Sequence, residues 1–455
     1  MADKVKQPKE IDVFNRFSNF NKLKIIGIGL AIALVICTTI FFLAKIFSSY
    51  TISFETYGGL VYGEPIKTDT YKFLEKTREP VGLKKEGYYI EGYYTDAKFT
   101  NRFEFGKRTW NSKKLYVNWQ VGYAVQLFFA EGEDTNERPS TDTTGIDVAR
   151  LKLYHEQYVK PGSEYTLPLI YNDIQDNEHY GEQLYWNMEG DLESKPFATK
   201  TFTVSDNIKI FGTWFDTAED KFAVTQEGVL TRYLGECANV VLPSKVKKIK
   251  DIDKFTAGRW NVMNTADGSG YSAFDKVYEK LDTVIIGSEF QELGSHSFRN
   301  CSKLNRVYFE GNKIHTIGEW AFVECGNLAN LELPNSVRTI EDRAFYKSGI
   351  KTLTGLNNVE SIGYGAFMEC VSLKELELRN IATIDSLAFA GTTMSKLILT
   401  TADVPEVNMP TDDTDILWGN FVCKIYVPEA MLEEYSNKYP WSIYHQAGRV
   451  LAITE

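Results

Sequence analysis

Cysteine and histidine are scarce in this chain, which has six of the former and five of the latter among 455 residues. Six cysteines are too few for a disulfide framework at this length. The histidines are dispersed, and no two of them show the spacing of a zinc site or of a catalytic base with its partner. They are His155, His179, His296, His315 and His445. This distribution favours surface or packed imidazoles over a metal or catalytic site.

Short motifs of catalysis and phosphate binding are also missing from the sequence. Neither Gly-x-Ser-x-Gly nor His-Glu-x-x-His occurs, and no glycine-rich phosphate loop is present. We therefore expect no enzyme activity, no metal and no cofactor. A pair of distant carboxylates for glycoside hydrolysis stays open, because any fold can bring two acids together.

One acidic run in residues 401–415 leaves calcium binding open, because carboxylate oxygens are the ligands that calcium prefers. Its members are Asp403, Glu406, Asp412, Asp413 and Asp415. They lack the EF-hand spacing, so a solvated loop is the default interpretation.

Basic residues are outnumbered, since 50 lysines and arginines stand against 61 aspartates and glutamates, for a net charge of -11. Residues 1–50 hold seven basic and three acidic groups, so the rest of the chain carries -15. An acidic exterior argues against nucleic acid as a partner, because binding to phosphates needs clustered Lys and Arg that replace counterions.

An uncharged hydrophobic run lies near the N-terminus. Residues 25–44 contain no charge and are flanked by Lys22 and Lys24 before and by Lys45 after. At about 1.5 Å per residue, a helix of this length crosses a hydrocarbon core of about 30 Å. A cleaved signal peptide is the competing interpretation, but its apolar stretch of about 7–15 residues is shorter and ends in small residues.

The basic residues around this run predict its orientation. Most of them precede it, which places the N-terminus in the cytoplasm by the positive-inside rule. We predict a cytoplasmic tail at residues 1–22, a transmembrane signal anchor at residues 23–48, and an extracellular remainder.

Residues 51–119 alternate short apolar strands with turns and show no helical period. The strings TISFETYGG, KKEGYYIEGYYTDAKF and LYVNW resemble the Listeria-Bacteroides repeat, also called the internalin B-repeat, a small β-grasp-like extracellular module. Tyr93 stands where that family often has Trp. Residues 120–215 look like a second, divergent copy, whose closing Trp214 is in register with Trp119 and which carries a polar insertion at 131–144.

The strongest pattern is a repeat of 22 to 24 residues in the C-terminal half. Phenylalanines recur at this interval, each preceded by apolar residues eight and five positions earlier: Phe298, Phe322, Phe345, Phe367 and Phe389. Three residues after each stands a small side chain: Cys301, Cys325, Ser348, Cys370 and Thr392. One such residue per turn predicts a stacked structural column, like the buried Asn or Cys column of leucine-rich repeats. Metal binding by this column finds no support, because no C-x2-C spacing accompanies it.

A short strand with apolar residues follows each column residue, and one such turn cannot bury its own apolar edge, so we expect the turns to stack. The string LPNSVRTIEDRAF at residues 333–345 resembles the BspA-type leucine-rich repeat of surface proteins from gut and oral bacteria and some parasitic protists. The likeness spans residues 222–455, with an opening turn at 222–246 and an end piece that begins at Lys424. Residues 250–281 and 400–422 do not fit the period and are interpreted as insertions.

Together these patterns predict a mainly β protein with an N-terminal transmembrane helix, two small β-grasp-like modules (51–119 and 120–215) and a C-terminal leucine-rich-repeat solenoid (222–455). The uncharged run predicts a single-pass protein that contacts the lipid bilayer through residues 25–44. The resemblance implies a cell-surface protein that binds an extracellular protein or glycan, for example in adhesion. A structural or assembly component of the cell envelope is the alternative. A carbohydrate-active enzyme is a third reading with less support.

The concave face of the predicted solenoid is the candidate binding surface. Its outward strand positions mix aromatic, hydroxyl and charged groups, although for any one of them an ordinary solvated role stays open. They are Thr283, Ile285, Arg306, Tyr308, Asn330, Glu332, Thr352, Thr354, Glu375, Glu377, Lys396 and Ile398.

Overall fold

The computed structural model describes residues 11–46, 48–72, 75–109, 111–130, 151–170, 181–188, 194–250, 273–408 and 415–453. The chain forms two compact units. The first comprises Met1–Gln126, Glu156–Tyr165 and Phe202–Ile208, and the second comprises Leu127–His155, Thr166–Thr201 and Lys209–Glu455. The polar insertion predicted at 131–144 lies outside the described residues.

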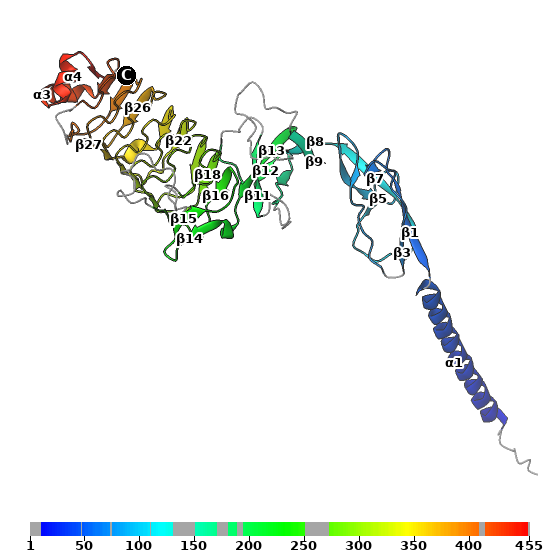
Figure 1. The fold of residues 1–455 in the computed structure, drawn as a ribbon. Helices are drawn as coiled ribbons and strands as arrows, with labels where there is room; N and C mark the ends of the chain where they lie inside the picture. Colours follow the sequence, from blue (N-terminus) through cyan, green and yellow to red (C-terminus); the bar gives the residue numbers. More distant parts are fainter. Residues whose placement is uncertain are drawn as a thin grey trace, which may run out of the picture. The chain divides into compact units, whose positions relative to one another are not determined.

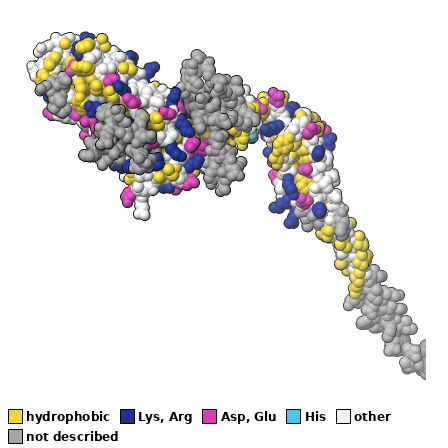
Figure 2. All heavy atoms as spheres, viewed as in Figure 1, with side chains coloured by type: hydrophobic (Ala, Val, Ile, Leu, Met, Phe, Trp, Pro, Cys, Tyr) yellow, Lys and Arg dark blue, Asp and Glu magenta, His cyan; other side chains and the backbone are white. Residues whose placement is uncertain are grey.

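A long helix, α1 (Ile11–Ile46), belongs to the first unit. Its stretch Ile28–Ile46 has a mean hydropathy of 2.3, and the protein buries none of it. Leu30 and Leu34 are each 67% exposed, and Figure 2 shows this part of the helix covered with hydrophobic side chains. A helix that is apolar on every side and uncovered by protein suits a lipid environment. The predicted apolar helix is therefore confirmed, while the choice between an anchor and a cleaved signal peptide stays a prediction.

A five-stranded sheet in the order β3-β1-β7-β5-β6 forms the body of the first unit. β1 runs parallel to β7, and the other pairs in the sheet are antiparallel. A separate two-stranded ribbon is formed by β2 and β4. The strand bounds are β1 Ser49–Glu55, β2 Leu60–Val61, β3 Asp69–Lys72, β4 Leu83–Lys84, β5 Tyr88–Tyr94, β6 Arg102–Phe103 and β7 Lys113–Val121.

The core of this sheet is small and partly aromatic. Ile52 and Leu115 are fully buried, because alternate residues of each strand point inward. Tyr93 is also buried, and its ring meets Phe54 at 6.3 Å and Phe105 at 4.9 Å, both edge to face. Tyr93 is therefore a core residue of this sheet. The β-grasp-like resemblance stays a prediction.

The next strands run from residue 123 to residue 216. Among them β11 and β13 pair antiparallel in an unbroken register from Glu182 opposite Asp216 to Met188 opposite Ile210. β13 then pairs in parallel with β16, so the same sheet continues into the repeats that follow. The bounds are β8 Tyr123–Ala130, β9 Leu151–Val159, β10 Glu164–Thr166, β11 Glu182–Met188, β12 Thr201–Thr203 and β13 Ile208–Asp216.

Residues 222–453, here called the repeat region, stack turn upon turn in the second unit (Figure 1). One side is an eight-stranded sheet that is parallel after its first antiparallel pair. Its strands are β14 Phe222–Val224, β15 Val229–Tyr233, β17 Lys248–Ile249, β19 Glu292–Leu293, β21 Thr316–Ile317, β23 Thr339–Ile340, β25 Ser361–Ile362 and β27 Thr383–Ile384.

The other side of the repeat region carries the five strands predicted after the column residues, β20, β22, β24, β26 and β28, together with further strands at both ends. These strands are β16 Asn239–Val241, β18 Thr283–Ile286, β20 Arg306–Phe309, β22 Asn330–Glu332, β24 Thr352–Thr354, β26 Glu375–Leu378, β28 Lys396–Leu399, β29 Lys424–Val427 and β30 Val450–Ala452. Short 3-10 segments occur at η2 Glu219–Lys221, η3 Leu356–Asn358 and η4 Glu429–Met431. Two helices, α3 Leu432–Asn437 and α4 Trp441–Gln446, lie at the C-terminal end.

The recurring phenylalanines form a continuous stack inside the repeat region, as the spacing predicts. All five are 0% exposed. Neighbouring rings lie 5.2–5.6 Å apart, with interplanar angles of 3–17°. Each ring therefore packs on the same residue of the next turn, which couples the turns to one another.

The stack extends beyond the predicted period at both ends. Phe274 lies 5.2 Å from Phe298 in the same stacked orientation, so residues 273–281 form part of a regular turn, whereas residues 251–272 lie outside the described part of the chain. At the other end, the Phe389 amide donates to the carbonyl of Ile416, just as the Phe367 amide donates to Ala388. This register puts Leu417 in the phenylalanine position. The segments 250–281 and 400–422 do break the 22- to 24-residue spacing, as predicted, but their described parts also contribute residues to regular turns.

The small residues of the column link successive turns by hydrogen bonds. The Cys325 thiol donates to the Phe298 carbonyl at 3.1 Å, and the Cys370 thiol donates to the Phe345 carbonyl at 2.9 Å. Asn420 continues the column, and its amide donates to the Thr392 hydroxyl at 3.2 Å. All described cysteines are free thiols, and those of the column are buried. The structural role predicted for this column agrees with these contacts.

Candidate binding face

The strands on the second side of the repeat region align side chains from one turn to the next. Parallel pairing of β22 with β24 places Asn330 beside Thr352 and Glu332 beside Thr354. The leucines between them are buried, because alternate strand residues point to opposite sides. The outward positions of these strands therefore form two parallel rows on one surface.

The predicted face residues divide into three environments. Asn330, Glu332, Thr352, Thr354, Glu375 and Glu377 are exposed. Tyr308, Lys396 and Ile398 are half-buried. Thr283, Ile285 and Arg306 are buried, at 0%, 1% and 6% exposure. The expectation of an open surface was wrong for these last three, because the first turns adjoin the sheet of β11 and β13 and the segment at Ser194 and Lys195.

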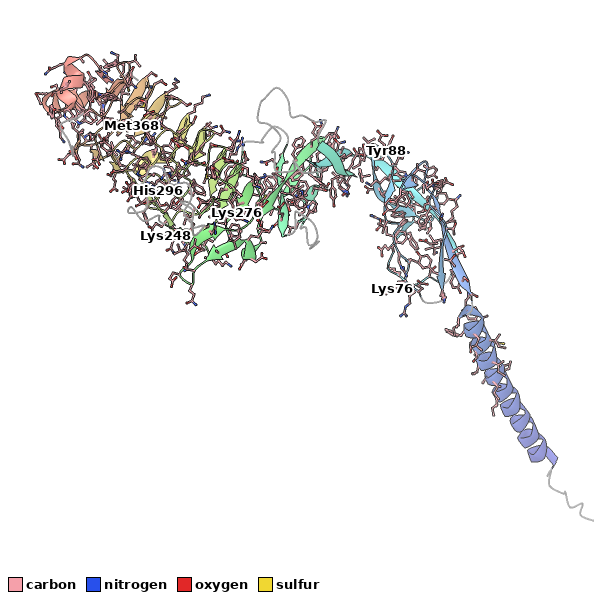
Figure 3. All side chains as sticks on the ribbon, in the orientation of Figure 1. Lys76, Tyr88, Lys248, Lys276, His296 and Met368 are labelled. Carbon is pink, nitrogen blue, oxygen red and sulfur yellow. The ribbon has the colours of Figure 1, made fainter. Side chains whose placement is uncertain are left out.

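A groove of about 1070 Å³ lies over β20, β22 and β24. Most of the side chains that line it are amides, hydroxyls or charged groups, and Arg306 and Tyr308 lie at its N-terminal end. Figure 3 shows the side chains of these turns on the ribbon, with His296 and Met368 labelled on turns before and after the groove strands. The groove therefore offers hydrogen-bonding groups rather than an apolar pocket.

A segment from before the repeat region closes this end of the groove. The Tyr308 hydroxyl donates to the Ser194 carbonyl at 3.1 Å, and the Lys195 ammonium lies 2.6 Å from the Glu310 carboxylate. The Asn187 amide also donates to the Ser194 carbonyl, at 2.9 Å. Sequence reasoning missed Ser194 and Lys195, because they precede their partners by more than a hundred residues and belong to no repeat.

Four exposed side chains in the groove are not engaged by the protein. Asn330, Glu332, Thr352 and Thr354, here called the polar quartet, have no side-chain hydrogen bond or ion pair with any residue that the structure describes. Their donors and acceptors are open to solvent, and their backbones are held by the parallel pair β22 and β24. Because strand pairing holds the backbone, the spacing of these side chains is set before a polar ligand binds, and only side-chain rotamer freedom is lost on binding.

Three charged side chains in the C-terminal half of the same face have partners within the protein. Glu377 forms an ion pair with Arg379 at 3.0 Å, and the Lys396 ammonium lies 5.3 Å from the centre of the Tyr426 ring. The Lys424 ammonium donates to the Gly448 carbonyl at 3.1 Å. These charges already have partners, so the polar quartet is the better candidate for ligand binding.

A buried polar cluster lies where β13 meets the first repeat turns. The Asp216 carboxylate accepts a hydrogen bond from the Tyr233 hydroxyl at 2.7 Å, and the Lys221 ammonium lies 3.6 Å away. Burial raises the pKa of Asp216, although the Tyr233 hydrogen bond and Lys221 act in the opposite direction. Asp216 and Tyr233 are both 0% exposed, so this cluster joins the sheet to the repeats and offers no surface to a substrate.

The acidic run considered for calcium does not form a site in the described residues. Those residues contain no group of three His, Cys, Asp or Glu side chains that could hold a metal ion. Asp415 is engaged instead, because its carboxylate accepts hydrogen bonds from the Leu417 amide and the Tyr444 hydroxyl. Asp412 and Asp413 lie outside the described residues.

Several solved structures are similar to part of this chain. A leucine-rich-repeat protein of T. pallidum is 21% identical over 42% of this chain and 85% of its own, with a TM-score of 0.27. One from Bacteroides ovatus is 17% identical over 47% and 71%, with a TM-score of 0.26. A leucine rich cell surface protein of Faecalibacterium prausnitzii is 16% identical over 51% and 92%, with a TM-score of 0.19.

Among curated proteins, none matches this chain. A sequence family does match: residues 233–327 and 311–406 fit the BspA type leucine rich repeat region, with six copies. The matched residues contain the phenylalanine stack and the strands of the groove. Residues 233–406 therefore form a region of BspA-type leucine-rich repeats.

Proposed function

We propose that the chain is a membrane-anchored cell-surface protein that binds an extracellular partner through the solenoid formed by its repeat region. The observation that carries the proposal is the groove over β22 and β24, where the polar quartet is exposed, ordered by strand pairing and unengaged by the described protein. Proteins of the leucine-rich-repeat surface type support an extracellular binding or adhesion role.

The anchoring part of the proposal is supported by α1. Its apolar stretch Ile28–Ile46 is uncovered, and the basic residues before it favour a cytoplasmic N-terminus. The sheet of the first unit follows this helix in the sequence and precedes the repeat region. No catalytic role is assigned to any residue.

Topology is tested on intact cells that express the full chain with one tag at each end. We expect externally added protease to remove the C-terminal tag and to leave the N-terminal tag intact until the cells are opened. A membrane fraction that retains the full-length chain would support an uncleaved anchor. Protection of the C-terminal tag in intact cells, or loss of the N-terminal tag during export, would contradict the proposal.

Binding is tested by adhesion of the same cells to host cells, host matrix and the envelope of the producing organism. Glu332→Ala is expected to weaken binding by about ten- to a hundredfold, because each lost charged hydrogen bond contributes roughly 1.5–3 kcal/mol. The matched control is Glu433→Ala, at an exposed site on α3 outside the groove. Equal binding by both variants would remove the groove from the proposal.

Which surface the cells bind also separates two roles. Binding to host material supports adhesion. Binding confined to the producing organism's own envelope would instead support the structural or assembly role.

A further inference from the structure

We propose that the groove holds the terminal sugar of an uncharged glycan, with the polar quartet as its hydrogen-bonding floor. This inference rests on the proposed function, because it names the ligand class of the same face. Three features carry it: the chemistry of the quartet, the charge balance of the groove, and its closed N-terminal end.

The quartet matches the hydroxyl groups of a sugar. The Asn330 amide both donates and accepts, the Glu332 carboxylate accepts at two oxygens, and the two threonine hydroxyls do both. Sugar hydroxyls also donate and accept, so each can pair with one of these groups. Neighbouring strands lie about 4.8 Å apart and alternate residues about 6.8 Å apart, which gives the quartet the footprint of a single sugar ring.

The charges around the quartet balance. Lys195 and Arg306 are basic and Glu310 and Glu332 are acidic, all within the lining of the groove. Lys195 and Glu310 neutralise each other in their ion pair. An acidic sugar or a phosphate would face the Glu332 carboxylate, and among the lining residues that the structure describes a basic peptide would find no excess of negative charge. An uncharged ligand therefore fits this lining best.

A protein partner fits the quartet less well. Protein interfaces depend on buried apolar and aromatic anchors at their centre. Large apolar side chains that are strongly exposed in the repeat region lie elsewhere, for example Val371 (58%), Phe421 (84%) and Val422 (66%). These residues follow column positions on the turns and do not line the groove. The quartet itself offers polar atoms alone.

Because the groove is closed at its N-terminal end, the ligand that fits it is the terminal sugar of a glycan chain. Ser194 and Lys195 stand across the face at β20, held by Tyr308 and Glu310. A polysaccharide lying along the rows would meet this barrier, whereas a terminal sugar reaches the quartet with its chain leaving toward β26. The half-buried Tyr308 ring borders this end and offers an apolar surface to the sugar.

The test uses the purified full chain in lipid nanodiscs on an array of uncharged oligosaccharides with hexoses and N-acetylhexosamines at their ends. We expect binding to a set that shares one terminal sugar, and about tenfold weaker binding when that sugar is capped by a further residue. Both substitutions keep side-chain shape: Glu332→Gln exchanges one of the two acceptor oxygens for a donor, and Thr352→Val removes the hydroxyl, so each is expected to weaken binding about tenfold. Glu433→Gln is the matched control and is expected to bind like the unchanged chain.

A gate variant tests the closed end separately. Lys195→Ala removes the ion pair with Glu310, and we expect it to accept oligosaccharides in which the preferred sugar is internal. Failure to bind any uncharged oligosaccharide, or unchanged binding by the quartet variants, would overturn the inference. If adhesion still depends on Glu332 and survives enzymatic removal of glycans from the target cells, the ligand is a protein and only this inference fails. If adhesion is absent altogether, the proposed function fails as well.

Discussion

The repeat region and the sheet of the first unit hold their chains together in different ways. In the repeat region one buried position, the phenylalanine, recurs from turn to turn and packs on its own copies at 5.2–5.6 Å. In the first unit six different buried residues close one small core around Leu115 and Tyr93. Because the core position of the repeat region recurs, the spacing of residues in the sequence predicts it. The core of the first unit depends on which strands pair, and residue spacing does not predict that.

The largest expected effect comes from breaking the stack in its middle. Phe345 is 0% exposed between Phe322 and Phe367, so Phe345→Ala leaves a cavity that its neighbours cannot fill. We expect a loss of about 4 kcal/mol of stability in the repeat region. Hydrogen exchange of the full chain, read by mass spectrometry, should show faster exchange on both sides of Phe345 and unchanged exchange in residues 49–121.

The reciprocal variant is Leu115→Ala, in the core of the first unit. Leu115 is fully buried on β7, and its truncation should cost about 3 kcal/mol within that unit. Exchange in the repeat region should not change, because each unit has its own core. Coupled acceleration of exchange in both units by either variant would contradict the comparison.

A smaller effect is expected at the thiol column. Burial raises the pKa of Cys370 to about 12, and its thiol donates to the Phe345 carbonyl. Cys370→Ala should cost about 1.5 kcal/mol through the lost hydrogen bond and a small cavity. At pH 8.5 the folded chain should resist alkylation at Cys370, and urea should restore reactivity.

The same raised pKa predicts a pH dependence. Ionisation of the thiol is disfavoured in the fold, so the stabilising contribution is complete below pH 9 and falls as pH rises from about 9 toward 12. Cys370→Ala should therefore lose less stability over this range than the unchanged chain, as measured by denaturant unfolding at each pH. If the two proteins lost equal stability between pH 9 and pH 12, this thiol would not ionise on unfolding.

The sequence predicted the repeats well because their apolar positions are periodic, and it missed features that have no period. Phe274 was not assigned to the stack because residues 251–272 separate it from the preceding turn. Leu417 was not assigned to it because it is not a phenylalanine. The burial of Arg306 and the closure by Lys195 depend on contacts between segments more than a hundred residues apart. The spacing of residues within the repeats does not predict such contacts.

Backbone conformation was equally invisible in the sequence. In each of the five turns, the residues two positions before and two positions after the phenylalanine adopt a positive φ, between 50° and 67°. Many of them are not glycine: His296, Asn300, Trp320, Glu324, Arg343, Lys347, Glu369 and Leu387. Left-handed backbone disfavours side chains by roughly 1–2 kcal/mol, so a glycine pattern is the signal that would have revealed these positions. Backbone hydrogen bonds to the next turn, such as that from the Lys347 amide to the Met368 carbonyl, keep them in place.

The smallest predicted effect tests whether these bonds hold the backbone under strain. Lys347 has a φ of 55° and is exposed, and the matching positions of later turns are Glu369 and Gly391. Lys347→Gly should stabilise the repeat region by about 0.5 kcal/mol, because relief of the left-handed strain exceeds the extra entropy of glycine in the unfolded chain. Lys351→Gly is the matched control: this lysine is exposed too, but its φ is not positive, so the same change should cost about 0.5–1 kcal/mol. Opposite signs in denaturant unfolding would show that the turn geometry is imposed by stacking on neighbouring turns, and equal losses would show that Lys347 is not strained.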